Sequence, residues 1–255
     1  MTRDMRELDL PQLRRIVADQ ARPLGFATVS GAHLYGFPSV DSDVDLRGTH
    51  VLPAAEVVGL RTGPETLTRS WLDDGAEIDL VTHDIGKFCR LLLQRNGYVA
   101  EQLLSPLVVT SSELHREMVD LAPHCLTRFH AHHYLGFART QQRVFDSTGE
   151  LKPLLYTFRV LLTGLHLMRS GEVVADLREL RLLVPEAPDY LGELIAAKAA
   201  GGEHARADLV PEDRLLADIE AAQTALESAQ ESSKLPERAT AEPALHDLVV
   251  RSRFN

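Results

Sequence analysis

The chain has 255 residues, of which 44% are hydrophobic and 5% aromatic, and its formal net charge at pH 7 is -10. A chain of this length can bury one large hydrophobic core or two smaller ones. The acidic balance argues against a protein that binds nucleic acid through its overall charge, although a local basic groove remains compatible with it.

Cysteine usage and hydropathy predict a cytoplasmic protein. Cys89 and Cys125 are far apart and do not form a CxxC pair, which fits a reducing compartment without a disulfide framework or zinc ribbon. The first ten residues, MTRDMRELDL, lack an apolar stretch, so we expect no signal peptide. No apolar run approaches the roughly 20 residues of a membrane span, so we expect no membrane partner.

The first part of the chain shows helical and strand patterns in turn. The periodicity predicts an amphipathic helix over residues 10–21, a buried strand over 24–30 and a turn-rich loop over 31–42. Further strands are expected over 43–52 and 75–82. A helix that Asp84 caps then runs to about Arg95, where Asn96-Gly97 stops it. This order predicts a small α/β unit.

From about residue 111 the pattern becomes helical. Helices are predicted over residues 114–121, 128–145, 151–169, 191–200 and 214–230. We therefore expect an α+β fold with a first domain over residues 1–110 and a mainly helical domain over 111–255.

The acidic segment over residues 30–50, SGAHLYGFPSVDSDVDLRGTH, carries the most chemical information. Alternate side chains of a strand share a face, so Asp43 and Asp45 project together, about 7 Å apart along the backbone. Two carboxylates this close repel each other unless a cation lies between them. Their hard oxygen atoms favour Mg²⁺ or Mn²⁺ over zinc. Since a bare D-x-D is common, the alternative is a solvated turn with an aspartate cap.

Asp79 is the candidate for a third carboxylate. It lies between Ile78 and Leu80 in a predicted strand, where a charge is costly unless it is paired. A neighbouring strand would bring it beside the first two aspartates. Three carboxylates around two metal ions suit nucleotidyl transfer, in which one ion activates the attacking hydroxyl and the other neutralises the triphosphate. Glu77 faces the same side and is the second choice, and a surface role for Asp79 is the alternative.

Charged and aromatic residues around this acidic group are candidates for contact with a nucleotide. Arg47 is in phase with the aspartates and could contact phosphates or neutralise the carboxylates. Lys87, on the helix after Asp79, could touch a triphosphate, although a lone helical lysine is more often solvated. His33 and Tyr35 could meet the nucleotide or pack the turn.

The helical part offers one further candidate face. Lys152, Tyr156 and Arg159 are spaced by four and three residues, which places them on one side of a helix. Such a face could hold the triphosphate or the base of a nucleotide. The alternative is a helix surface of ordinary charge.

These features together resemble the DNA polymerase β-type nucleotidyltransferases, whose pattern is a strand, a Gly-Ser turn, a D-x-D strand and a third aspartate on a later strand. Residues 30–50 and the segment EIDLVTHDIGKFCRLLLQRNGYVAEQLLSP look like one group within them, the RNA ligase-associated (RlaP-like) predicted nucleotidyltransferases. The resemblance covers roughly residues 24–110 and is thinner over the helical part. It implies that Asp43, Asp45 and Asp79 are the catalytic, metal-binding triad, with two Mg²⁺ or Mn²⁺ ions.

The resemblance also implies that a turn beginning at Gly31 holds the triphosphate. This chain has Gly31-Ala32 where the superfamily has Gly-Ser, so one hydroxyl contact to a phosphate is missing. Backbone N–H groups could still cradle the phosphate, and Ser30 or His33 could supply the missing donor. The expected nucleotide-binding residues are Ser30, Gly31, Ala32, His33, Tyr35, Ser42, Arg47, Lys87, Lys152, Tyr156 and Arg159.

We therefore expect an enzyme that moves an NMP from an NTP such as ATP to a hydroxyl acceptor and releases pyrophosphate. The family's association with RNA ligases favours an RNA end as the acceptor, by analogy, whereas the acidic charge favours a small molecule or a protein. Ala32 motivates an alternative, a catalytically weak nucleotide-binding regulatory or antitoxin-like module. An antibiotic adenylyltransferase is a third possibility, and the oligomeric state stays open.

Overall fold

The computed structural model describes residues 8–73, 75–201 and 205–254. The first seven residues, where no signal peptide is expected, lie outside this part. Two compact units share the described chain. The sheet unit comprises residues up to 31, residues 43–125 and residues from 238 onwards, and the helical unit comprises residues 32–42 and 126–237. No helix in residues 8–73, 75–201 or 205–254 is long and apolar enough to cross a lipid bilayer.

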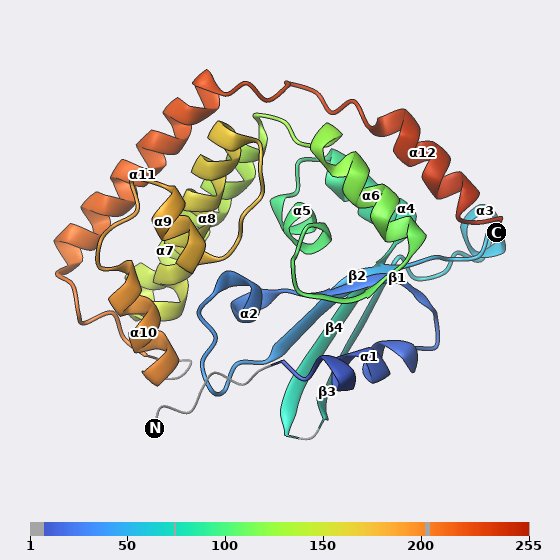
Figure 1. The fold of residues 1–255 in the computed structure, drawn as a ribbon, viewed down its shortest axis with the longest axis horizontal. Helices are drawn as coiled ribbons and strands as arrows, with labels where there is room; N and C mark the ends of the chain where they lie inside the picture. Colours follow the sequence, from blue (N-terminus) through green and yellow to red (C-terminus); the bar gives the residue numbers. More distant parts are fainter. Residues whose placement is uncertain (1–7, 74, 202–204, 255) are drawn as a thin grey trace. The chain divides into compact units, whose positions relative to one another are not determined.

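Five strands of the sheet unit form one mixed sheet in the order β3-β4-β2-β1-β5 (Figure 1). The strands are β1 (Leu24–Val29), β2 (Val44–His50), β3 (Thr66–Asp73), β4 (Ala76–Asp84) and β5 (Val108–Ser111). β2 and β4 run parallel, and the other neighbouring pairs are antiparallel. Parallel neighbours need a long connection, and here the connection includes β3, which lies at the edge beyond β4.

Helices cover both faces of this sheet. The helices of the sheet unit are α1 (Leu10–Ala18), α3 (Ala55–Val58), α4 (Ile85–Leu93), α5 (Gly97–Leu103), α6 (Glu113–Leu121), a 3-10 turn over Ala122–His124, and α12 (Glu242–Arg251). α1 lies against one face, and α4 and α5 lie against the other (Figure 1). On the α4 face, the ring of Phe26 meets Phe88 edge-on at 5.4 Å and stacks on His115 at 4.5 Å.

The alternation predicted for the two central strands is confirmed. Val44 and Leu46 of β2 and Ile78 and Leu80 of β4 are buried in the core beneath α1. The residues between them, including Asp79, are only partly buried. Since alternate side chains of a strand point to opposite faces, the polar residues look away from that core.

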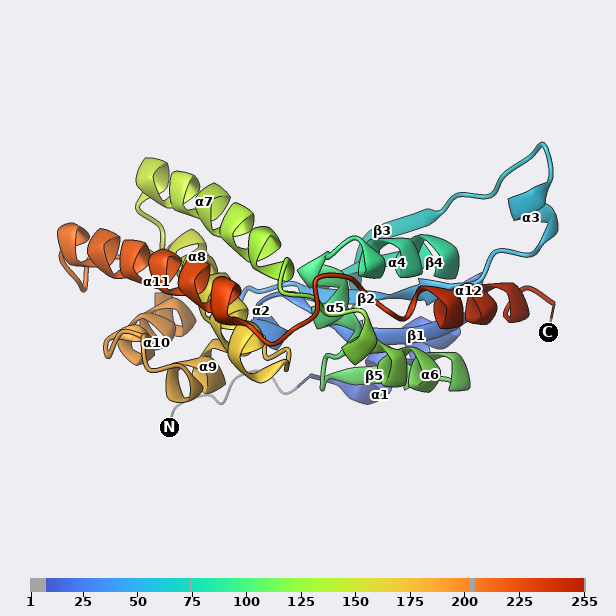
Figure 2. The same cartoon turned by 90° about the horizontal axis from the view of Figure 1, so that it is seen from above.

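The helical unit is built around one buried helix. Its helices are α7 (His130–Thr148), α8 (Leu151–Ser170), α9 (Leu177–Leu183), α10 (Leu191–Gly201) and α11 (Glu212–Ser232). Gly149 adopts a left-handed conformation with φ 64° at the end of α7, which lets the chain turn at once into α8. α7 and α11 both pack along α8, which is buried over most of its length (Figure 2).

The expected α+β fold with a mainly helical later part is confirmed, and the longer helices begin and end within a few residues of prediction. Two local predictions are wrong. Residues 31–42 are not all loop, since α2 (Gly31–Tyr35) follows β1 directly. Asn96 does not stop α4, which ends at Leu93; its side chain instead caps α5. Sequence reasoning missed β3, β5, α3, α5, α9 and α12, which are short or weakly periodic.

The boundary between the two domains is predicted near residue 110. β5 pairs with β1 and α6 packs on β1, so the chain on both sides of residue 110 belongs to the sheet unit. The division into domains over residues 1–110 and 111–255 stays a prediction.

Candidate active site

A row of polar side chains crosses three neighbouring strands of the sheet unit. Asp45 of β2 and Asp79 of β4 are direct partners in the parallel register, and Ser70 of β3 is paired with Asp79. Side chains of directly paired residues share a face of the sheet. Ser70 donates a hydrogen bond from Oγ to Asp79 Oδ1 at 2.8 Å. Ser70 was missed because β3 was not predicted, although its threonines and Trp71 are typical of strands.

The guanidinium of Arg47 joins the two aspartates. Its Nη2 forms ion pairs with Asp45 Oδ1 and with Asp79 Oδ2, the latter at 3.0 Å. Its Nη1 donates to the backbone carbonyls of Asp79 at 2.7 Å and Leu46 at 2.9 Å. Arg47 thus neutralises the two carboxylates in the structure, and its contact with phosphates stays a prediction.

Asp43 and Asp79 both act on Asp45 electrostatically. Burial raises the pKa of Asp45, Arg47 opposes this shift, and the negative charges of Asp43 and Asp79 add to it. Asp43 lies directly before β2 and close to Asp45 in sequence, so its negative charge acts on the Asp45 carboxylate. Within the described part of the chain, no group of three or more His, Cys, Asp and Glu side chains is arranged to hold a metal ion. The metal-binding triad therefore stays a prediction.

The Gly31 turn lies directly against Asp45. Gly31 has φ +61°, and a Cβ atom on it would stand 1.7 Å from Asp45 Oδ2. The Ser30 N–H donates to the backbone carbonyl of Asp45 at 2.8 Å. Ser30 is 4% exposed, and its contact with a phosphate stays a prediction. Only glycine permits this close approach of backbone and carboxylate.

The donor atoms at this place fit a divalent cation. Asp45 and Asp79 present carboxylate oxygens on one face and already bind a cationic group, the Arg47 guanidinium. Hard oxygen donors of this kind suit Mg²⁺ or Mn²⁺. Glu77, the second choice for the third carboxylate, is exposed and lies one strand repeat from Asp79.

Three of the expected nucleotide-binding residues come together inside the helical unit. The guanidinium of Arg159, on α8, lies 3.8 Å from the ring centre of Tyr35, and the rings of Tyr35 and Tyr156 meet edge-on at 5.4 Å. Arg159 is 1% exposed, so it does not belong to an ordinary helix surface. Lys152 lies on α8 one turn before Tyr156. Their contacts with a nucleotide stay predictions.

The remaining expected residues of the helical unit lie within α2 or shortly after it. Ala32 is 8% exposed and His33 is partly buried. Ser42 Oγ accepts a hydrogen bond from the Ser39 N–H at 2.9 Å. Ser39 Oγ in turn accepts one from the buried Lys198 Nζ at 2.8 Å. Lys198 lies in the last turn of α10, where the sequence shows no signal for this contact, so it was missed.

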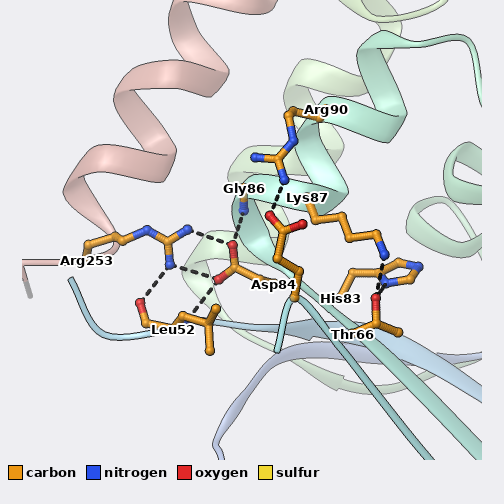
Figure 3. A network of polar contacts seen from close by, with 9 residues as sticks. Leu52, Thr66, His83, Asp84, Gly86, Lys87, Arg90 and Arg253 are labelled. Atoms are coloured by element: carbon orange, nitrogen blue, oxygen red, sulfur yellow. Dashed lines mark hydrogen bonds and ion pairs between the residues drawn. The ribbon is translucent and has the colours of Figure 1, made fainter. Parts of the chain in front are cut away.

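Lys87 is not brought to the aspartates. Its Nζ donates to Thr66 Oγ1 at 2.5 Å, and Thr66 Oγ1 lies 3.0 Å from His83 Nδ1 (Figure 3). His83 follows Asp79 by four residues on β4, which corresponds to about 13 Å along a strand. A nucleotide contact of Lys87 stays a prediction and draws no support from this geometry.

Comparison with known proteins identifies the family of the chain. Residues 5–251 match the model of the family described as RlaP: RNA repair pathway DNA polymerase beta family. The chain is 32% identical over 178 residues to the uncharacterized protein MJ0002 of Methanocaldococcus jannaschii, a match covering 68% of this chain and 72% of that protein.

Among solved structures, a nucleotidyltransferase-like protein from Exiguobacterium sibiricum 255-15 is similar at 16% identity, over 87% of this chain and 73% of that one. The TM-score between the two structures is 0.34. The assignment therefore depends on the family model, which spans almost the whole chain, and on the archaeal relative. The chain belongs to the RNA repair pathway DNA polymerase beta family, within the polymerase β-type nucleotidyltransferases.

Proposed function

We propose that the protein is a metal-dependent nucleotidyltransferase that moves an NMP from an NTP to a hydroxyl acceptor and releases pyrophosphate. The observation that carries the proposal is the paired Asp45 and Asp79 on one face of the sheet, with the Gly31 turn against Asp45. Membership of a polymerase β-type family supports nucleotidyl transfer as the class of reaction.

In this reaction the acceptor oxygen forms a bond to the α-phosphorus while the bond from that phosphorus to the β-phosphate oxygen breaks. Asp43, Asp45 and Asp79 would hold the divalent ions. Bound Mg²⁺ or Mn²⁺ would supply positive charge to the triphosphate and lower the pKa of the attacking hydroxyl. The Gly31 turn would bring backbone to the phosphates beside Asp45, since it carries no side chain there.

An RNA end is our proposed acceptor, and the cytoplasm our proposed location. The family's description names an RNA repair pathway, which supports the acceptor. Cys89 and Cys125 are both free and buried, which fits a reducing compartment.

The test is transfer of label from each α-labelled NTP with Mg²⁺, in the presence of RNA with free ends. Asp45→Asn should lower label transfer and pyrophosphate release by at least about 100-fold, because a metal ligand supports several kcal/mol of transition-state stabilisation. Asp120→Asn is the matched control: it removes an exposed carboxylate of α6 and should leave the rate unchanged.

Three further results would change the proposal. Saturable NTP binding without turnover on any acceptor would favour a regulatory module, which the missing hydroxyl at Ala32 motivates. Transfer to aminoglycosides and not to RNA would make the protein an antibiotic adenylyltransferase. Wild-type turnover in Asp45→Asn would remove the aspartate pair from the mechanism.

A further inference from the structure

We propose that Arg47 is an internal counter-cation: it holds Asp45 and Asp79 together in the metal-free protein and must release them before a divalent ion can bind. This inference rests on the proposed metal-dependent function. It concerns a property of the chain's own side chains, so metal binding can test it without an assay of catalysis.

The two nitrogens of the guanidinium have separate partners. Nη2 contacts only carboxylate oxygens, Oδ1 of Asp45 and Oδ2 of Asp79. Nη1 contacts only backbone carbonyls, those of Leu46 and Asp79. Because both nitrogens belong to one planar group, the guanidinium must turn or withdraw as a whole to release the carboxylates.

The other carboxylate oxygens already have neighbours. Asp79 Oδ1 accepts the hydrogen bond from Ser70 Oγ at 2.8 Å. Asp45 Oδ2 lies beside the Cα of Gly31, where even a methyl group would not fit. The pair of oxygens that converge between β2 and β4 are thus the two that Arg47 binds.

Repulsion between Asp45 and Asp79 accounts for a cationic side chain at position 47. Asp45 and Asp79 are direct register partners, and two ionised carboxylates so placed repel each other unless a cation intervenes. The guanidinium supplies that cation through Nη2, which contacts both carboxylates. A divalent ion would compete for the same oxygens and would also meet the positive charge of Arg47, so Arg47 should weaken metal binding.

Arg47 can move without opening the core. Its side chain is 19% exposed, and those of Asp45 and Asp79 are 17% and 26% exposed. The apolar core beneath α1 lies on the opposite face of the sheet, because Val44, Leu46, Ile78 and Leu80 alternate with these polar residues.

The experiment is a titration of the full chain with Mn²⁺, followed by the electron paramagnetic resonance signal of free Mn²⁺. Arg47→Gln should bind Mn²⁺ about tenfold more tightly than the wild type, because it removes a competing cation. In the absence of metal its Tm should fall, and saturating Mn²⁺ should raise that Tm by more than it raises the wild-type value. Equal or weaker Mn²⁺ binding by Arg47→Gln would overturn the proposal.

Arg69→Gln is the matched control for net charge. Arg69 lies on β3 opposite Leu80, hence on the other face of the sheet, and it is exposed. Its Mn²⁺ affinity should stay within about twofold of wild type, because screening by solvent weakens a distant exposed charge. A gain equal to that of Arg47→Gln would show a general charge effect and would also overturn the proposal.

Arg47→Lys covers the case in which Arg47→Gln does not fold. Lysine keeps the charge but lacks the second nitrogen that anchors Arg47 to the backbone carbonyls, so Mn²⁺ should bind more tightly than to wild type, though less tightly than to a folded glutamine variant. Binding no tighter than wild type would count against the proposal. Absence of Mn²⁺ binding in every protein, or binding unchanged in Asp45→Asn, would overturn the metal-dependent function as well.

Discussion

At the scale of single residues, Gly31 is constrained both by its backbone and by its neighbour. Its φ of +61° is in the left-handed region, and the Asp45 carboxylate fills the space that a side chain would need. Gly75 shares the first constraint without the second, since its φ is +79° and nothing lies within 4 Å of the position of its Cβ. The two glycines therefore separate backbone strain from displacement of the aspartate.

Gly31→Ala should lower the free energy of unfolding by at least about 2 kcal/mol and abolish most of the nucleotidyl transfer, since Asp45 must move. Gly75→Ala should cost about 1 kcal/mol, from backbone strain alone, and leave transfer unchanged. Urea denaturation and the label-transfer assay measure the two effects. Equal loss of stability and full activity in both variants would contradict a role for the close approach at Gly31.

At the scale of elements, burial of titratable residues makes helix packing sensitive to acid. Within α7, burial lowers the pKa of His133 to about 4, and the positive charge of Arg159 adds to this shift. An unfolded histidine has a pKa near 6.5, so below that pH the unfolded chain binds a proton that the folded chain does not. The stabilisation is fully present above about pH 6.5 and is lost as the pH falls towards 4.

His133→Gln should therefore flatten the dependence of stability on pH between about 6.5 and 4, measured as the urea midpoint at each pH. His132→Gln, at the exposed neighbouring position of the same helix, is the control and should retain the wild-type slope. An unchanged slope in His133→Gln would mean that other groups govern the loss of stability in acid.

At the scale of the whole molecule, Arg253, which follows α12, joins this segment to the sheet unit through a buried ion pair with Asp84. Arg253 donates to Asp84 Oδ1 and Oδ2 at 2.8 and 2.7 Å, and to the carbonyl of Leu52 at 2.7 Å (Figure 3). Asp84 also accepts the N–H groups of Leu52 and Gly86, both at 2.9 Å, and so caps α4. Burial acts to raise the pKa of Asp84, but the hydrogen bonds from Arg253 and the backbone outweigh it and lower that pKa.

Arg253→Met should lower the free energy of unfolding by about 3–5 kcal/mol at pH 7, because it leaves the buried Asp84 carboxylate without its counter-ion. The lowered pKa of Asp84 means that this stabilisation is present above the unfolded pKa and disappears as the pH falls through the folded one. The variant should thus resemble the wild type more closely in strong acid. Urea denaturation at several pH values measures this.

Arg251→Met is the control, because the ion pair of Arg251 with Glu117 is exposed to solvent and should change stability much less. A loss in Arg253→Met no larger than in this control would show that the C-terminal segment is not held by the ion pair with Asp84.

Features that depend on near neighbours along the chain can be predicted from the sequence alone. The alternation of Val44, Asp45, Leu46 and Arg47 predicts which side chains enter the core, and it holds in the structure. The long helices followed from their periodicity, and the motifs over residues 30–50 and 77–106 together carried the resemblance to the family.

Which of these residues meet depends on packing between segments and is seen only in the folded chain. Three features join separate segments of the chain: the parallel register that pairs Asp45 with Asp79, the position of Arg47 between them, and the close approach of Gly31 to Asp45. Ser70 meets Asp79 through the pairing of β3 with β4, and Arg253 meets Asp84 across most of the chain. Local periodicity shows which way a side chain points, but strand order, register and partners depend on how distant segments pack against one another.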